Sequence, residues 1–158
     1  MKELIGNAPI NPLVFYTGKT AGYFLWVIYL MFLSGIQVFS SHEHQVLAVI
    51  SYLLSFFGTL LVIISLFNLG KSTRLGLPGK KTVLKNKGIY RFSRNPMYLG
   101  FDLWTLSCML ITLNPWIICL GIYSLVVYHL IIRGEEKFLQ QRFGQEYVAY
   151  RQKVRRYF

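Results

Sequence analysis

Cysteine is scarce in this sequence. The chain of 158 residues contains 2 cysteines, Cys108 and Cys119, and both lie in long apolar runs. A free cysteine in such a place usually behaves as a small apolar side chain, so these residues do not indicate a disulfide framework. His129 has no cysteine or acid at metal-ligand spacing, and we therefore expect no metal site.

Acidic residues are also few. The chain has 6 Asp and Glu against 17 Lys and Arg, which gives a net charge of +11, yet 54% of its residues are hydrophobic. A soluble domain has an apolar share of about 45–50%. Both facts are explained if the apolar residues form membrane spans and the bases lie in the connections. We therefore expect the bilayer as a partner and no nucleic acid.

Charged residues are absent from residues 21–39 and 46–69. Each run is long enough to cross a hydrocarbon core of about 30 Å at about 1.5 Å per residue. Residues 115–132 contain only His129 as a titratable base, and residues 98–113 contain Asp102 as their one charged residue. The sequence therefore predicts one all-α, polytopic membrane domain over residues 1–158, with about four transmembrane helices.

Lys and Arg are missing from residues 40–45 and from the turn at Asn114, but they are concentrated in residues 70–95 and after residue 132. Bases near the ends of membrane spans collect on the cytoplasmic side. We therefore predict a multi-pass protein whose two termini and 70–95 loop are cytoplasmic. Attraction to anionic lipids accounts for some of these bases as well.

The last two spans form a helical hairpin, because only Asn114 and Pro115 separate them. Beyond the hairpin, apolar and aromatic residues recur at helical spacing and predict an amphipathic tail helix that continues from the last span. These residues are Leu139, Phe143, Tyr147, Tyr150 and Val154.

The hairpin should bring two sets of polar residues together at the membrane surface. Residues 88–100 supply bases and aromatic rings, and residues 133–136 supply two carboxylates. Two ordinary alternatives remain open, namely that the tyrosines anchor the interface and that the acids are solvated. Asp102 shares a helix face with Tyr98, and an ionisable group inside a span usually faces a cavity.

These residues resemble a known family, the isoprenylcysteine carboxyl methyltransferases and their relatives, which include phospholipid methyltransferases. The resemblance lies in five pieces that occur in the family's order and spacing. They are residues 82–85 (TVLK), 88–90 (GIY), 94–100 (RNPMYLG), 135–136 (EE) and 143–150 (FGQEYVAY). Residues 70–154 are therefore identified as the methyltransferase-like catalytic part.

The resemblance implies methyl transfer from S-adenosylmethionine to a lipophilic or lipid-modified substrate with a carboxylate, thiol or amine head. It places the cofactor on Thr82, Val83, Leu84, Lys85, Tyr90, Asn95, Pro96, Met97, Tyr98, Glu135 and Glu136. We assign Arg94, Asp102 and Arg133 to the substrate side. Ile131 stands where the family has an arginine that engages the substrate carboxylate, and Thr82 and Asn95 stand where it commonly has histidine.

Two other functions compete with methyl transfer. A membrane reductase of the sterol type uses NADPH and has a similar motif at a late span, but those proteins resemble this pattern with Asn-Tyr-x-Gly-Glu after the proline. Here Phe101 follows Gly100. A non-enzymatic basic membrane adaptor explains the charge but not the ordered pieces. Methyl transfer is therefore the favoured interpretation.

Overall fold

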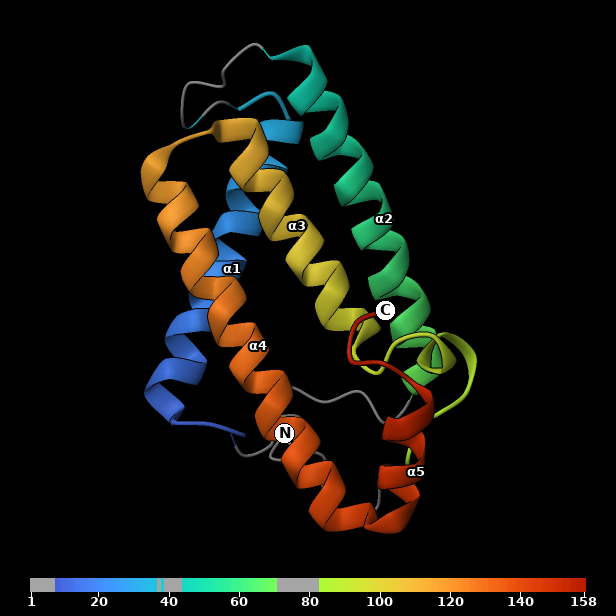
Figure 1. The fold of residues 1–158 in the computed structure, drawn as a ribbon. Coiled ribbons are helices and arrows are strands. Elements are labelled where there is room, and N and C mark those ends of the chain that lie inside the picture. The colour runs from blue at the N-terminus through green and yellow to red at the C-terminus, as the bar shows by residue number, and fades with distance from the viewer. Residues whose placement is uncertain (1–7, 37, 39–43, 71–82) are drawn as a thin grey trace.

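Four long helices run side by side, and a short fifth helix folds back at one end (Figure 1). The computed structural model describes residues 8–36, 38, 44–70 and 83–158. The helices are α1 (Pro12–Leu33), α2 (Gln45–Leu69), α3 (Pro96–Thr112), α4 (Pro115–Phe143) and α5 (Gln145–Lys153), with a 3-10 turn, η2, at Gly88–Arg91. The described residues contain no strand, which confirms the all-α class.

Proline and asparagine determine where the helices of the hairpin begin. Pro96 and Pro115 occupy the first turns of α3 and α4, where the missing backbone N–H costs nothing. The Asn114 side chain then accepts hydrogen bonds from the backbone N–H groups of Trp116 and Ile117, the second and third residues of α4, at 2.9 and 3.4 Å. The predicted tight hairpin is confirmed, and Leu113 makes the turn with a φ of 43°.

The predicted bounds of the first span, residues 21–39, are wrong for the helix that forms there. Helix α1 begins at Pro12, because the side chain of Asn11 accepts a hydrogen bond from the backbone N–H of Leu13 at 2.9 Å. Lys19 therefore lies inside α1 and does not precede it. The helix ends at Leu33, and Gly35, two residues later, has a φ of 82°.

The predicted tail helix is also divided in two. Helix α4 continues past the apolar span to Phe143, and Gly144, with a φ of 52°, reverses the chain before α5. The residues expected on one helical face still meet, but from two antiparallel pieces. Leu84, Tyr147, Tyr150 and Val154 are buried together, with Leu139 and Phe143 packed against them.

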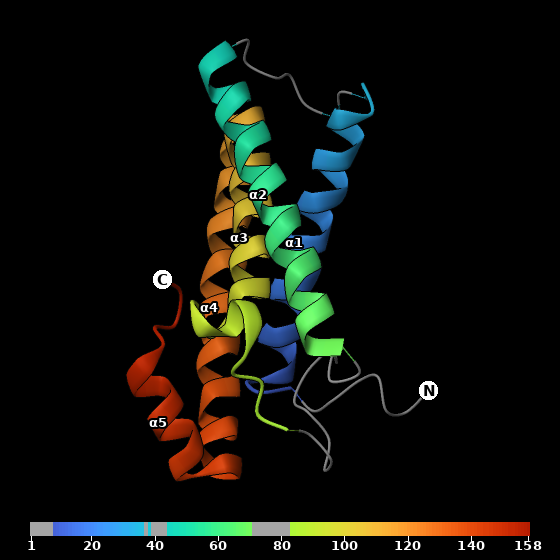
Figure 2. The same cartoon turned by 90° about the vertical axis from the view of Figure 1, so that its right-hand side faces the viewer.

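Helix α3 lies at the centre of the bundle. It packs against α2 on one side and against α4 and α1 on the other, while α1 packs along α4 (Figure 2). The core around α3 is aromatic: the Phe101 ring lies 4.7 Å from the Trp26 ring and 6.2 Å from each of the rings of Tyr98 and Tyr128, between centroids. The start of α3 thereby lies beside the second half of α4 at one end of the molecule.

Helices α2 and α4 are long and apolar enough to cross a membrane, judged by length and composition. In α2 only Ser51, Gly58 and Ser65 are buried, and the other faces of this 25-residue helix expose apolar side chains. Water disfavours an exposed apolar surface of this extent, whereas lipid accommodates it. Helix α3 has 17 residues, so it spans about 25 Å at about 1.5 Å per residue.

Candidate functional site

The two polar sets predicted from the sequence lie side by side where α3 begins and α4 leaves the bundle. The Tyr98 hydroxyl donates a hydrogen bond to Oε1 of Glu135 at 2.7 Å. Nη2 of Arg94 lies 3.0 Å from Oε1 of Glu136. These groups are far from the turn that joins α3 to α4, and the antiparallel packing of the two helices brings them together.

Glu136 is the most densely bonded of these residues. Its side chain is 8% exposed, and it lies between the guanidinium groups of Arg94 and Arg156. Arg156 donates to Oε2 through Nε at 3.1 Å and through Nη2 at 2.8 Å, and Nδ2 of Asn95 donates to Oε1 at 3.4 Å. The hydrogen bond to Glu136 raises the pKa of the Arg156 guanidinium, which therefore stays charged.

Arg94 has donor capacity that the protein does not use. Its side chain is 7% exposed, and Nε and Nη1 are buried with no hydrogen-bond partner among the described residues. A buried charged donor without an acceptor costs free energy, of the order of 1–3 kcal/mol or more. An acidic group of a ligand would satisfy one of these two donors, which lie on different edges of the guanidinium.

Glu135 has a different environment from its neighbour. Tyr98, which is buried, binds one of its two oxygens, and the ammonium group of Lys19 in α1 attracts the carboxylate. No arginine is paired with Glu135 among the described residues, whereas Glu136 has two. Glu135 is therefore the carboxylate of this pair that can still accept from a cationic group of a ligand.

Tyr90 is held between α2 and α5. It is buried in η2, its hydroxyl lies against Ser65 of α2, and its carbonyl accepts a hydrogen bond from the Tyr150 hydroxyl at 2.7 Å. Burial raises the pKa of both phenols, so both stay neutral and protonated. Burial also raises the pKa of Tyr147 to about 12. Helix α5 thus supports the loop that leads into α3.

The remaining predicted residues differ in how far they are buried. Leu84 and Pro96 are buried, and the residues that follow them, Lys85 and Met97, are half-buried. Val83 and Arg133 are exposed. Arg133 is exposed on α4, whereas Glu136, three residues later, is buried. Thr82 lies outside the described residues. Asp102 lies in the second turn of α3, and its Oδ1 is buried with no partner among the described residues.

Sequence reasoning missed the contribution of residues 154–158, which we call the tail segment. The Arg156 carbonyl accepts hydrogen bonds from Oγ of Ser93 at 3.2 Å and from Nδ2 of Asn95 at 3.3 Å. The Arg155 carbonyl accepts from the backbone N–H of Arg94 at 3.1 Å. Contacts through backbone carbonyls leave no pattern in the sequence. The sequence did contain one indication of this contact, namely a carboxylate at Glu136 that needs cationic partners and two arginines that follow α5.

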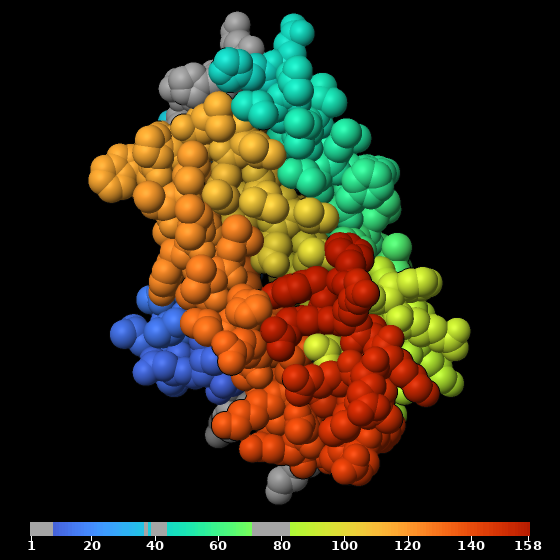
Figure 3. All heavy atoms as spheres, viewed as in Figure 1, coloured from blue at the N-terminus to red at the C-terminus, as the bar shows by residue number. Residues whose placement is uncertain are grey.

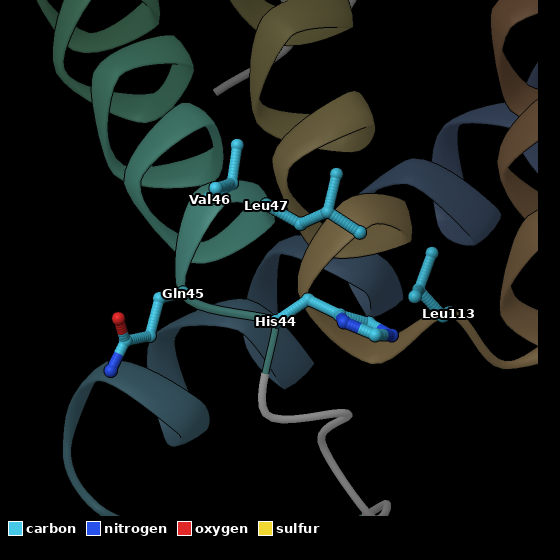
Figure 4. A pocket seen from close by; sticks show the side chains of 5 residues that line it. All are labelled: His44, Gln45, Val46, Leu47 and Leu113. Atoms are coloured by element: carbon cyan, nitrogen blue, oxygen red, sulfur yellow. The ribbon is translucent and has the colours of Figure 1, made fainter.

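A cavity of about 500 Å³ lies elsewhere in the molecule. It is lined by His44, Gln45, Val46, Leu47 and Leu113, with the His44 side chain extending toward Leu113 (Figure 4). These residues are at the start of α2 and just after the end of α3, whereas the Glu135–Glu136 site is at the start of α3. This cavity is therefore separate from the candidate site.

Comparison with known proteins identifies the family to which the chain belongs. The family model described as phospholipid methyltransferase matches residues 46–146, which is more than half of the chain and includes both halves of the site. The chain belongs to this phospholipid methyltransferase family. The expected resemblance is thereby confirmed.

Curated relatives include three named protein-S-isoprenylcysteine O-methyltransferase. The protein from Saccharomyces cerevisiae is 41% identical over 46% of this chain and 30% of its own length. That from Dictyostelium discoideum is 38% identical over 46% of this chain and 31% of its own length. That from Rattus norvegicus is 29% identical over 65% of this chain and 37% of its own length. The chain therefore spans about a third of the length of the curated relatives it matches.

Proposed function

We propose that this protein transfers a methyl group from S-adenosylmethionine to a lipophilic acceptor at the Glu135–Glu136 site. The observation that carries the proposal is that the hairpin joins the motif of residues 94–100 to the carboxylate pair, with Tyr98 on Glu135 and Arg94 on Glu136. Family membership supports the reaction class, and the names of the three relatives support an acceptor that carries a lipid.

The residues of the site fit the polar end of this cofactor. An unused N–H group of Arg94 suits a carboxylate oxygen, and Glu135 suits an ammonium group. The ring of Tyr90 or Tyr98 suits a sulfonium, since a cation over an aromatic face gains about 0.5–2 kcal/mol. When bound, the cofactor supplies a methyl group on a positively charged sulfur. In this proposal the cofactor also contacts Val83, Leu84, Lys85, Asn95, Pro96 and Met97, and Thr82 is assigned to it by the family resemblance.

The chain's own residues act on this reaction mainly by holding groups in place. Alignment of a nucleophile with a leaving group can contribute about 7–11 kcal/mol to the barrier reduction. Tyr98 and Glu136 are buried and hydrogen-bonded, so they hold the start of α3 against α4 with little freedom. A carboxylate acceptor is already ionised near neutral pH and needs no base.

The acceptor approaches from the bilayer between α3 and α4 in this proposal, with its head near Asp102 and Arg94. An amine head would pair with Asp102, and a carboxylate head would pair with Arg94 or Arg133. Ile131, which replaces the family's substrate arginine, is fully buried in the core and offers no charge. The specificity of the relatives for isoprenylcysteine therefore need not hold for this chain.

The topology that suits this reaction has α1, α2, α3 and α4 all crossing the membrane, with both termini and the 70–95 loop in the cytoplasm. The start of α1 and of α3 and the ends of α2 and of α4 lie at one end of the bundle (Figure 1). The bases after residue 132 and in residues 83–94 are at that same end. Residues 1–158 form one membrane-embedded domain with the catalytic part at residues 70–154.

Equilibrium binding to the purified protein in detergent tests the proposal. We expect S-adenosylmethionine to bind and NADPH not to bind. Binding of NADPH alone would support the reductase, and binding of neither cofactor would support a non-enzymatic membrane protein.

A further inference from the structure

The tail segment, residues 154–158, returns from α5 to the start of α3. It crosses in front of the lower part of α3 and lies beside α4 (Figure 3). The backbone carbonyls of Arg155 and Arg156 accept hydrogen bonds from residues 93–95, which precede α3. These backbone contacts hold the Arg156 side chain beside the Glu136 carboxylate, although the two residues are 20 positions apart in the chain.

The two oxygens of the Glu136 carboxylate have separate partners. Oε1 lies 3.0 Å from Nη2 of Arg94 and accepts from Nδ2 of Asn95 at 3.4 Å. Oε2 accepts from Nε and Nη2 of Arg156, at 3.1 and 2.8 Å. Arg156 therefore occupies, with two donors, the oxygen that Arg94 does not contact.

This division leaves donors of Arg94 free. A guanidinium and a carboxylate often pair through two parallel hydrogen bonds. Without Arg156, Oε2 of Glu136 could make the second of these bonds to Nε or Nη1 of Arg94. In the structure both of these groups are buried with no acceptor among the described residues, and the contact to Glu136 is made by Nη2. Arg156 thus keeps Oε2 away from both donors.

The charges of these side chains point in the same direction. Two guanidinium groups share one carboxylate, so Arg94, Glu136 and Arg156 together carry one net positive charge. The Arg94 side chain is 7% exposed, and a buried charge interacts more strongly with a nearby ion than an exposed one does. An anionic group of a ligand is therefore attracted to Arg94 only while Arg156 balances Glu136.

We propose that Arg156 is a positioning residue: it holds Glu136 so that Arg94 can bind the carboxylate of the cofactor. This inference rests on the proposed function, in which Arg94 binds that carboxylate and Glu135 binds the ammonium group. Arg156 acts through Glu136 and Arg94 and does not touch the cofactor. Its removal lets Glu136 take a donor of Arg94 and neutralise its charge, so the cofactor's carboxylate is held less tightly, whereas the ammonium contact at Glu135 remains.

Two forms of the cofactor separate this role from a purely structural one. Decarboxylated S-adenosylmethionine keeps the ammonium, the sulfonium and the adenine but lacks the carboxylate. Equilibrium binding in detergent gives the ratio of its dissociation constant to that of S-adenosylmethionine. A partly unfolded sample changes both constants by the same factor, so the ratio is unaffected. We expect Arg156→Ala to lower the ratio about tenfold, which is equivalent to about 1.4 kcal/mol.

The matched control is Arg155→Ala. It removes the same charge one residue earlier, but the Arg155 side chain is exposed and its contact with Arg94 is made by the backbone carbonyl, so the ratio should keep its original value. Arg156→Met keeps the length of the side chain without its donors, and it should lower the ratio as Arg156→Ala does. Arg156→Met serves as the test if Arg156→Ala does not fold.

Two results would overturn the inference while S-adenosylmethionine still binds. One is an unchanged ratio in the folded Arg156 variants. The other is a ratio near one in the unmodified chain, since Arg94 would then not bind the carboxylate. Failure of the proposed function would appear separately, as an absence of S-adenosylmethionine binding to the unmodified chain, and it would remove this inference as well.

Discussion

Glu135 and Glu136 are adjacent in the chain, but their carboxylates have different partners. Glu136 accepts from two arginines and Asn95 and is nearly inaccessible to solvent. Glu135 accepts from Tyr98 and feels the charge of Lys19. We therefore propose that Glu136 holds the tail segment and the start of α3 together, and that Glu135 binds the ammonium group of the cofactor.

Replacing Glu135 tests the binding role. We expect Glu135→Ala to weaken S-adenosylmethionine binding by about 1.5–3 kcal/mol, or roughly 10- to 150-fold, because a charged hydrogen bond is lost. Equilibrium binding in detergent measures the change. The control is Glu146→Ala, since Glu146 is an exposed acid in the first turn of α5. Unchanged affinity in Glu135→Ala would remove Glu135 from the cofactor site.

Replacing Glu136 tests the holding role. We expect Glu136→Ala to lower the free energy of unfolding by about 3 kcal/mol, because the buried Arg94 loses its partner. This is the lower end of the range for a buried ion pair, since the Arg156 side chain is 29% exposed and solvent screens it. Thermal unfolding in detergent measures the loss, with Glu146→Ala again as the control. A variant as stable as the unmodified chain would contradict the account of Glu136.

Among the helices, the backbones of α2 and α3 approach each other closely at two glycines. A Cβ on Gly100 would lie 2.6 Å from the carbonyl oxygen of Gly58, and a Cβ on Gly58 would lie 2.8 Å from the carbonyl oxygen of Gly100. Small residues at helix contacts in membranes let the two backbones approach in this way. Gly100 is the last residue of the 94–100 motif, so this contact fixes the position of the motif relative to α2.

We predict that Gly100→Ala forces α2 and α3 apart and destabilises the protein by about 1–3 kcal/mol, the usual cost of overpacking. Leu53→Ala on the exposed face of α2 removes side-chain atoms without touching this contact, and its unfolding temperature in detergent should stay near the original. If Gly100→Ala unfolds at the same temperature as Leu53→Ala, the contact is not tight.

Helix positions could be predicted from the sequence where a cap and a long apolar run coincide. The start of α4 and the hairpin turn follow from Asn114 and Pro115. Lys19 obscured the start of α1, because a single charge interrupts an apolar run without ending a helix. The fold-back of α5 depends on the backbone conformation of Gly144, and periodicity alone continues through such a residue. The tail segment's contacts join residues about 60 apart through backbone carbonyls, which no local pattern encodes.

For the whole molecule, the distribution of bases gives a topology that labelling can test. We expect a membrane-impermeant maleimide, applied to intact cells, to label Trp116→Cys and to miss Lys87→Cys and Arg151→Cys, because the last two lie at the basic end. The background chain has Cys108 and Cys119 replaced by alanine. Trp116 is 81% exposed at the opposite end and serves as the positive control. Labelling of Lys87→Cys or Arg151→Cys without permeabilisation would reverse the topology.

In the proposed reaction, methyl groups pass from S-adenosylmethionine to a lipophilic acceptor at the site that contains Glu135. The most direct measurement follows tritium from methyl-labelled S-adenosylmethionine into the organic phase after extraction of membranes that contain the protein. We predict label in the organic phase with the unmodified chain and with Glu146→Ala, and loss of this label with Glu135→Ala. Label that stays in the aqueous phase with the unmodified chain, although the cofactor binds, would contradict the proposed reaction.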